Sequence, residues 1–183
     1  MDSLSDNALM LRVKAGDVDR MGLLFERYHR PLFRFLYHML GQAPASEDLV
    51  QTVFYRMLKY RHTYAADGEF RTWMYHLARN VLADEIKQNR HAAHHTDVAD
   101  LAEHFGGGRP ADADLEQTQD AAQLHQVLAR LSPENREVLV LSRFQELKYA
   151  QIAQLLGTTE GAVKVRIHRA MHELKAIYQR LEN

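Results

Sequence analysis

The clearest pattern of apolar and polar positions lies near the C-terminal end of the chain. Residues 148–156 and 160–174 each repeat apolar side chains at helical spacing, and Gly157 separates the two stretches. Glycine readily adopts the left-handed conformation that ends a helix, and the hydroxyls of Thr158 and Thr159 suit the start of the next one. The pattern therefore predicts two helices joined by a tight turn.

The second of these two helices has one apolar face and one basic face. The apolar face carries Val163, Ile167, Ala170 and Leu174. The other face carries Lys164, Arg166, His168, Arg169 and His172. This is the pattern of a helix-turn-helix, whose second helix enters the major groove of DNA. A helical hairpin with a solvated basic face is the alternative, but turn, caps, apolar face and cations together favour DNA binding.

The first half of the chain shows further stretches with helical periodicity. Ser5 caps the first predicted helix, and Gly16 ends it. The second begins at one of the two aspartates that follow and runs towards Leu40. Its apolar period continues beyond Pro31, so we expect this proline to kink the helix rather than end it.

The third stretch has an apolar surface that is wider than one core stripe. We expect Ser46 to cap this helix, with Glu47 and Asp48 at its positive N-terminal end. Its apolar residues are Leu49, Val50, Val53, Phe54, Met57 and Leu58. Two explanations stay open for the excess: a second contact face, or burial on two sides.

A fourth helix is expected from Phe70 to about Asn89, after a polar loop at residues 60–69. The residues predicted to face inward are Phe70, Trp73, Met74, Leu77, Val81 and Ile86. Asn80 is unusual on a helix, because its side chain competes with the backbone for hydrogen bonds. Its amide suits the reading of a base edge, since it both donates and accepts. A surface asparagine without a role is the alternative.

The second half of the chain separates into a linker and another helical domain. Residues 91–116 lose the helical period and are rich in Gly, Ala and Asp. Further along, Ser132 followed by Pro133 marks the start of a helix. The expected fold is all-α, with a four-helix domain at residues 1–90, a flexible linker at 91–116 and a helix-turn-helix domain at 117–183.

Charge is distributed unevenly along the 183 residues, although the formal net charge is −1. Residues 1–90 hold 13 Lys and Arg against 11 Asp and Glu, and residues 117–183 hold 9 against 7. The segment between them holds 1 against 6. Two mildly basic blocks therefore flank an acidic linker. Because this modest charge attracts phosphates weakly, tight DNA binding is expected to need help from another molecule.

Composition excludes several classes of function. The chain has no cysteine, and therefore no disulfide, thiolate metal site or cysteine nucleophile. It shows no signal-peptide pattern and no apolar run long enough to span a bilayer, so a cytoplasmic protein is expected. Gly-x-Ser-x-Gly, His-Glu-x-x-His and phosphate-loop motifs are also absent. We therefore expect neither an enzyme nor a bound cofactor.

Eleven histidines raise the question of a metal site. His91, His94 and His95 lie close together in sequence, and imidazoles bind zinc, nickel and copper. A flexible linker lacks the surrounding groups that fix such ligands in place. Solvated linker histidines are therefore the preferred interpretation.

Three long segments of the chain resemble one protein family. The segments are EDLVQTVFYRML (47–58), FRTWMYHLARNVLADEIKQNR (70–90) and LARLSPENREVLVLSRFQELKYAQIAQLLGTTEGAVKVRIHRAMHEL (128–174). Together they resemble a bacterial sigma factor of the extracytoplasmic-function (ECF) group in the sigma-70 family. The resemblance covers nearly everything outside the linker, and two halves in this order are more specific than a lone helix-turn-helix.

The resemblance implies that the chain binds core RNA polymerase, recognises the −35 and −10 elements of promoter DNA and opens DNA at the start site. It also implies an anti-sigma factor as a partner. The implied −35 residues are Glu160, Gly161, Lys164, Val165, Arg166, His168 and Arg169. The implied −10 residues are Tyr64, Asp67, Arg71, Arg79 and Asn80. The implied residues on or beside the polymerase-binding face are Asp48, Leu49, Gln51, Thr52 and Phe54.

Two positions depart from the family pattern. A glutamate common in the family is Gln151 here, and the usual arginine pair near the end of the fourth helix is reduced to Ile86-Lys87 and Arg90. Both departures leave the promoter sequence open. A second hypothesis also stays open at this stage: a stand-alone DNA-binding regulator whose N-terminal bundle senses a ligand or dimerises.

Overall fold

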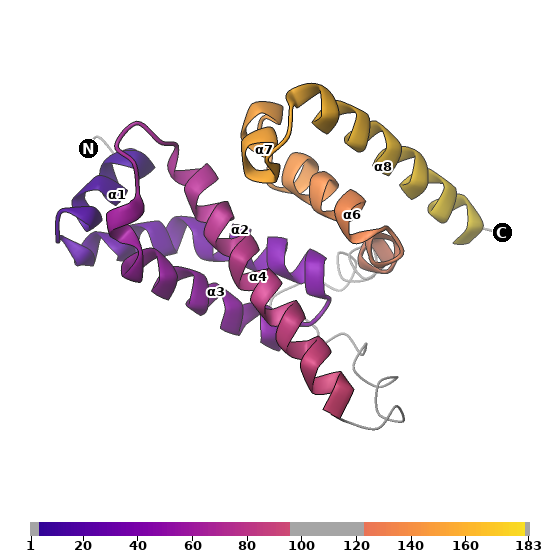
Figure 1. The fold of residues 1–183 in the computed structure, drawn as a ribbon, viewed down its shortest axis with the longest axis horizontal. Helices are drawn as coiled ribbons and strands as arrows, with labels where there is room; N and C mark the ends of the chain where they lie inside the picture. Colours follow the sequence, from indigo (N-terminus) through magenta and orange to yellow (C-terminus); the bar gives the residue numbers. More distant parts are fainter. Residues whose placement is uncertain (1–3, 96–122, 182–183) are drawn as a thin grey trace. The chain divides into compact units, whose positions relative to one another are not determined.

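The computed structural model describes residues 4–95 and 123–181, and every regular element within them is helical (Figure 1). These residues belong to two compact units. The first contains α1, α2 as far as Leu36, most of α3, and α4. The second contains α6, η3, α7 and α8. The all-α prediction is confirmed for the described residues, and most of the predicted linker, from residue 96 to residue 116, lies outside them.

The first helix starts and stops where the sequence predicts. α1 spans Asp6–Lys14, and the Ser5 hydroxyl accepts a 3.2 Å hydrogen bond from the nitrogen of Ala8. Gly16 follows with φ +112°, a conformation that glycine adopts without strain. A 3₁₀ turn, η1 (Val18–Arg20), then leads into α2 (Met21–Leu40). Pro31 lies inside α2 without ending it, as predicted.

The third helix begins earlier than the sequence suggested. α3 spans Ala43–Lys59, so Pro44 occupies its first turn, where the missing N–H leaves no bond unmade. Ser46 therefore does not cap the helix: it lies one turn inside, and its side chain is completely buried. Glu47 and Asp48 accordingly lie in the second turn. Charge at the helix start was a reasonable local signal, but the proline fixes an earlier start.

The wide apolar surface of α3 is explained by burial on two sides. Leu49 and Phe54 are only 7% and 6% exposed, and Val50, Val53 and Met57 are buried as well. Apolar groups on both flanks of this helix therefore contribute to the core of the first unit. Of the two explanations left open by the sequence, the structure supports the second.

The fourth helix, α4, spans Phe70–His95 and follows the short 3₁₀ turn η2 (Arg61–Thr63). Its buried residues are Phe70, Thr72, Met74, Tyr75, Ala78, Val81 and Leu82. Trp73 and Leu77 are half-buried, so they face inward only in part, and the predicted inward position of Ile86 is wrong because this side chain is 38% exposed. The true core stripe is rotated towards Tyr75 and Leu82, because α4 packs on its neighbours along that side.

The second unit closes around a separate core. Residues 123–129 are helical, and α6 (Pro133–Leu139) follows with Ser132 as its cap, as predicted. A π-helical turn, η3 (Val140–Phe144), leads to α7 (Tyr149–Leu156) and α8 (Glu160–Leu181). Figure 1 shows α7 and α8 meeting at a tight turn, with α6 beside them. The fully buried residues include Leu128, Val138, Leu141, Ile152, Val163 and Ala170.

Candidate functional site

The turn between α7 and α8 has the conformation that the sequence predicts. Gly157 takes the left-handed conformation, with φ 62° and ψ 40°. The nitrogen of Thr158 donates to the carbonyl oxygen of Ala153 at 2.9 Å, which closes the end of α7. The Thr159 hydroxyl accepts from the nitrogen of Ala162 at 3.2 Å and caps α8. The angle between the two helices is therefore fixed by local bonds.

Gln151 contributes to the other end of the same motif. Its side-chain oxygen accepts a 2.8 Å hydrogen bond from the backbone nitrogen of Lys148, just before the first residue of α7. An amide oxygen fills this capping position as a carboxylate does, but without the negative charge. The departure at this position therefore leaves the start of α7 capped.

The exposed side of α8 carries two neighbouring rows of side chains. Val163, Ile167 and Ala170 are buried against the rest of the unit. Residues four apart lie on one row of a helix, so one row carries Glu160, Lys164, His168 and His172, and the next carries Gly161, Val165 and Arg169. All seven are exposed, and Val165 is a 51% exposed apolar side chain between cations. Such a surface presents hydrogen-bond donors together with one apolar group.

Arg166 is placed differently from the other six predicted −35 residues. It is half-buried, whereas the other six are exposed, and together with Gly161, Val165 and Arg169 it lines a hollow of about 400 Å³ against α6. Nearby, the side-chain nitrogen of Asn135 donates a 2.5 Å hydrogen bond to a carboxylate oxygen of Glu173 on α8. These contacts fix α8 on α6, so the exposed rows are presented by a rigid support.

The polar loop at residues 60–69 is held from the inside by Tyr64. This side chain is only 1% exposed, and its hydroxyl donates to the carbonyl oxygen of Gly68 at 2.9 Å. Lys14 of α1 donates to the carbonyl oxygen of Tyr64 at 2.5 Å. Burial raises the pKa of the Tyr64 phenol, with smaller contributions from Asp6 and Glu69. Tyr64 is therefore placed to shape the loop, while Asp67 is exposed on its outside.

Trp73 joins this loop to the outer face of α4. Its ring meets Tyr64 edge-on at 5.3 Å, and its indole nitrogen donates to the Thr63 hydroxyl at 3.4 Å. Asn80 is exposed and lies seven residues along, two turns away on the same side of the helix. His76, also exposed, lies between them. The loop and this face of α4 form one continuous surface.

Arg71 and Arg79 lie off that surface. Nine residues separate Arg71 from Asn80, which places the two on opposite sides of α4. Arg71 is half-buried near Tyr75, whose pKa is raised by burial and lowered to a smaller extent by Arg71. Arg79 is likewise half-buried. The structure therefore brings Asn80 together with Trp73 and His76, and not with Arg71.

A strip of exposed side chains runs along α3. Asp48, Gln51 and Tyr55 follow one another at helical spacing and are exposed, and Thr52 beside them is half-exposed. Leu49 and Phe54 are buried on the two flanks of the strip. Tyr55, which the sequence interpretation did not single out, is 63% exposed. A large exposed aromatic among polar residues is typical of an interface anchor.

Comparison with known proteins accounts for both units. The family model for sigma-70 region 2 matches residues 24–92, and the model for sigma-70 region 4 matches residues 121–174. The ECF RNA polymerase sigma factor BldN of Streptomyces coelicolor is 33% identical over 93% of this chain. The chain belongs to the sigma-70 family, as an ECF sigma factor. Sigma factors are non-enzymatic subunits of RNA polymerase, and this one directs transcription initiation.

A second relative agrees with this assignment, and a solved structure shares the fold. The RNA polymerase sigma factor CarQ of Myxococcus xanthus is 28% identical over 94% of this chain. The chain spans 97% of the length of CarQ but only 66% of the length of BldN. The solved structure of the sigma factor RpoE with the anti-sigma factor NepR, from Bartonella quintana, has the same fold, with a TM-score of 0.73. The structural alignment with RpoE covers 86% of this chain and 96% of the RpoE chain, and 18% of the aligned residues are identical.

Proposed function

We propose that this sigma factor uses three surfaces during initiation: residues 160–169 of α8 for the −35 element, the loop and outer face of α4 for the −10 element, and the exposed strip of α3 for core polymerase. The observation that supports this best is the strip on α3. A stand-alone regulator that dimerises through its N-terminal bundle would also expose such a strip, but its bundle would not match sigma-70 region 2, as residues 24–92 do here. In this proposal residues 1–90 and 117–183 act as separate domains joined by residues 91–116, although residues 91–95 still belong to α4.

In the proposed −35 interaction, the N-terminal half of α8 enters the major groove. Lys164, His168 and Arg169 project donors from neighbouring rows, and an arginine that holds guanine with two hydrogen bonds gives about 1–3 kcal/mol of discrimination. Val165 offers an apolar contact for a thymine methyl group. Glu160 and Gly161 lie at the helix start, close to the DNA, and half-buried Arg166 is suited to a phosphate.

In the proposed −10 interaction, one base leaves the stack and is read on the outer face of α4. Unstacking costs a few kcal/mol per base, and aromatic stacking offsets part of that. Asn80 supplies the amide for the base edge, Trp73 an aromatic face, and Asp67 a polar group on the loop. Tyr64 acts indirectly in this proposal, because it holds the loop in place, and Arg71 and Arg79 lie away from the base that Asn80 contacts.

Core polymerase is proposed to bind the strip formed by Asp48, Gln51, Thr52 and Tyr55. Leu49 and Phe54 are buried on the two flanks of that strip, so they lie beside the interface rather than in it. A Tyr near the centre of such a patch contributes strongly to affinity, because its rigid ring buries a large area at little entropic cost. The location proposed for the chain is the cytoplasm, where core polymerase acts.

An anti-sigma factor is a further proposed partner. RpoE of Bartonella quintana, which has the same fold, was solved in complex with one. Each unit exposes apolar side chains that such an inhibitor could cover, Phe25 and Tyr55 on the first unit and Val165 and Tyr178 on the second. No described helix is long and apolar enough to cross a membrane.

Transcription in vitro with purified core polymerase tests the proposal. The full chain is expected to direct initiation on a library of genomic promoters, while free protein binds the same DNA weakly, because each contact alone is weak. Lys164→Ala and Arg169→Ala should each reduce initiation about tenfold or more. Lys175→Ala, which removes an exposed cation nearer the C-terminal end of α8, is the matched control and should leave initiation unchanged. Absence of initiation on every template refutes the proposal.

A further inference from the structure

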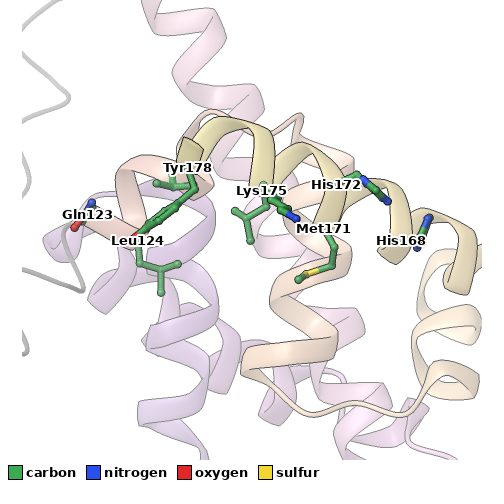
Figure 2. A pocket seen from close by; sticks show the side chains of 9 residues that line it. Gln123, Leu124, His168, Met171, His172, Lys175 and Tyr178 are labelled. Atoms are coloured by element: carbon green, nitrogen blue, oxygen red, sulfur yellow. The ribbon is translucent and has the colours of Figure 1, made fainter. Parts of the chain in front are cut away.

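Two histidines on α8 form a close pair on the outside of the second unit. His168 and His172 are four residues apart, and the centroids of their rings are 4.6 Å apart, with 70° between the ring planes. Both side chains are exposed. Figure 2 shows both imidazoles leaving the same side of the helix, at the end of a groove of about 760 Å³ between α8 and residues 123–127. Within the described part of the chain, neither ring takes part in a hydrogen bond or an ion pair.

This spacing suits chelation of a metal ion. Imidazole nitrogens bind Zn²⁺ at about 2.0–2.1 Å, and the same i, i+4 arrangement of two histidines on one helix holds zinc in metalloproteases. The His168 and His172 rings are already close together, so rotation about their side-chain bonds alone can bring one nitrogen of each ring to the same ion. Imidazole also favours Ni²⁺ and Cu²⁺, while Mg²⁺ and Ca²⁺ prefer oxygen ligands.

The surroundings limit the strength of such a site. The described residues contain no group of three or more His, Asp or Glu side chains able to hold a metal together. The ion would therefore have two protein ligands, and water would fill its other positions. Lys164 and Arg169 lie within one turn of His168, and their charge opposes a divalent cation. We expect weaker binding than in a structural zinc site, and therefore a site that fills only when the metal is abundant.

We propose that His168 and His172 bind one Zn²⁺, Ni²⁺ or Cu²⁺ ion, and that the bound ion excludes −35 DNA from α8. Binding of the ion rests on the geometry of the pair alone. The exclusion rests on the proposed function, in which His168 faces the promoter. A chelated ring has its nitrogen engaged, and the hydrated ion stands between the helix and the base edges. Metal and promoter then compete for the same face of α8.

Metal binding is tested with the full chain by titrating Zn²⁺ against a chromophoric chelator. The background variant carries His91→Gln, His94→Gln and His95→Gln, which removes the other histidine cluster. Adding His172→Gln to it should remove one bound ion, or weaken its affinity about tenfold or more. Circular dichroism checks that the helix content is unchanged, as expected for an exposed side chain. Equal zinc binding with and without His172→Gln overturns the proposal.

Exclusion is tested by promoter-directed transcription with and without Zn²⁺. The background variant should lose initiation as zinc fills the site and recover it with a chelator, and the variant that also carries His172→Gln should be much less sensitive. Equal sensitivity of the two overturns the exclusion. No transcription by either, even without metal, refutes the proposed function instead and leaves the zinc titration to decide on the metal site.

Discussion

The side-chain oxygen of Asn7 accepts a 2.8 Å hydrogen bond from the backbone nitrogen of Phe70, the first residue of α4. The two residues are 63 positions apart, so the start of α4 is capped by a side chain of α1. The loop before α4 and the outer face that carries Asn80 therefore depend on a residue far away in sequence.

Replacing Asn7 by Ala should destabilise the first unit by about 0.5–2 kcal/mol, because a buried donor at the helix start loses its acceptor. Chemical denaturation followed by helix content measures this. Asn7→Asp keeps an acceptor and is the matched control. If both variants have the stability of the parent protein, water caps α4 equally well.

Gly161→Ala separates helix stability from DNA contact. A Cβ at this position meets only the Thr159 hydroxyl oxygen at 3.9 Å, so alanine fits without strain. The variant should gain at most about 0.5 kcal/mol of stability, because glycine is a poor helix residue but Gly161 lies in the first turn of α8. If Gly161 lies against DNA, promoter binding by the holoenzyme should fall at the same time. Unchanged promoter binding would remove Gly161 from the −35 surface.

Tyr55→Ala should weaken binding to core polymerase by about 2 kcal/mol or more, roughly 30-fold, if Tyr55 anchors that interface. The stability of the Tyr55→Ala variant should hardly differ from that of the parent protein, since the Tyr55 ring is largely exposed. Tyr178→Ala, which removes another exposed tyrosine from α8, is the control. Fluorescence anisotropy with labelled protein and core polymerase gives the affinities, and equal affinities for the two variants would contradict the assignment.

Asn80→Ala should slow promoter opening while closed-complex binding and core binding stay nearly unchanged. The reason is that the amide is proposed to contact a base only after that base has left the stack. Asn89→Ala is the matched control, because Asn89 lies nine residues further along and on the opposite side of α4. A fluorescent base analogue in the −10 element reports opening. The same opening rate in both variants would exclude Asn80 from the −10 pocket.

The first unit should lose stability above about pH 10. Burial raises the pKa of Tyr28, with a further contribution from its hydrogen bond to Asp6, and burial also raises the pKa of Tyr75 and Tyr64. A group whose pKa is raised on folding contributes stability that is complete below its unfolded pKa, near 10 for tyrosine, and is lost as pH rises towards the folded value. Thermal unfolding between pH 9 and pH 12 measures the loss. Tyr28→Phe should show a shallower decline.

The sequence predicted those features whose cause is local. Ser5, Ser132 and Thr159 cap helices within three residues of themselves, and Gly157 ends α7 through its own backbone freedom. Such signals can be read along the chain, because the donor, the acceptor and the turn lie in one short segment.

Features that depend on distant contacts escaped the sequence interpretation. The period of α4 did not separate buried Tyr75 from exposed Ile86. The prominence of Tyr55 likewise follows from burial of the residues on either side of it in α3. Packing between elements decides which of these side chains are buried, and the periodicity of the sequence alone does not predict that packing.

If the loop at residues 60–69 receives the melted −10 strand, as proposed, its anchoring has a consequence for the speed and tightness of initiation. Because Lys14 and Gly68 hold Tyr64 at both its carbonyl and its hydroxyl, the loop has already given up its conformational freedom when the chain folds. The loop is then a preorganised binding site for a melted DNA strand, and binding of that strand costs little conformational entropy of the protein. Removing the hydrogen bonds that hold Tyr64 would therefore weaken binding of the melted strand, even if every group that contacts a base were left intact.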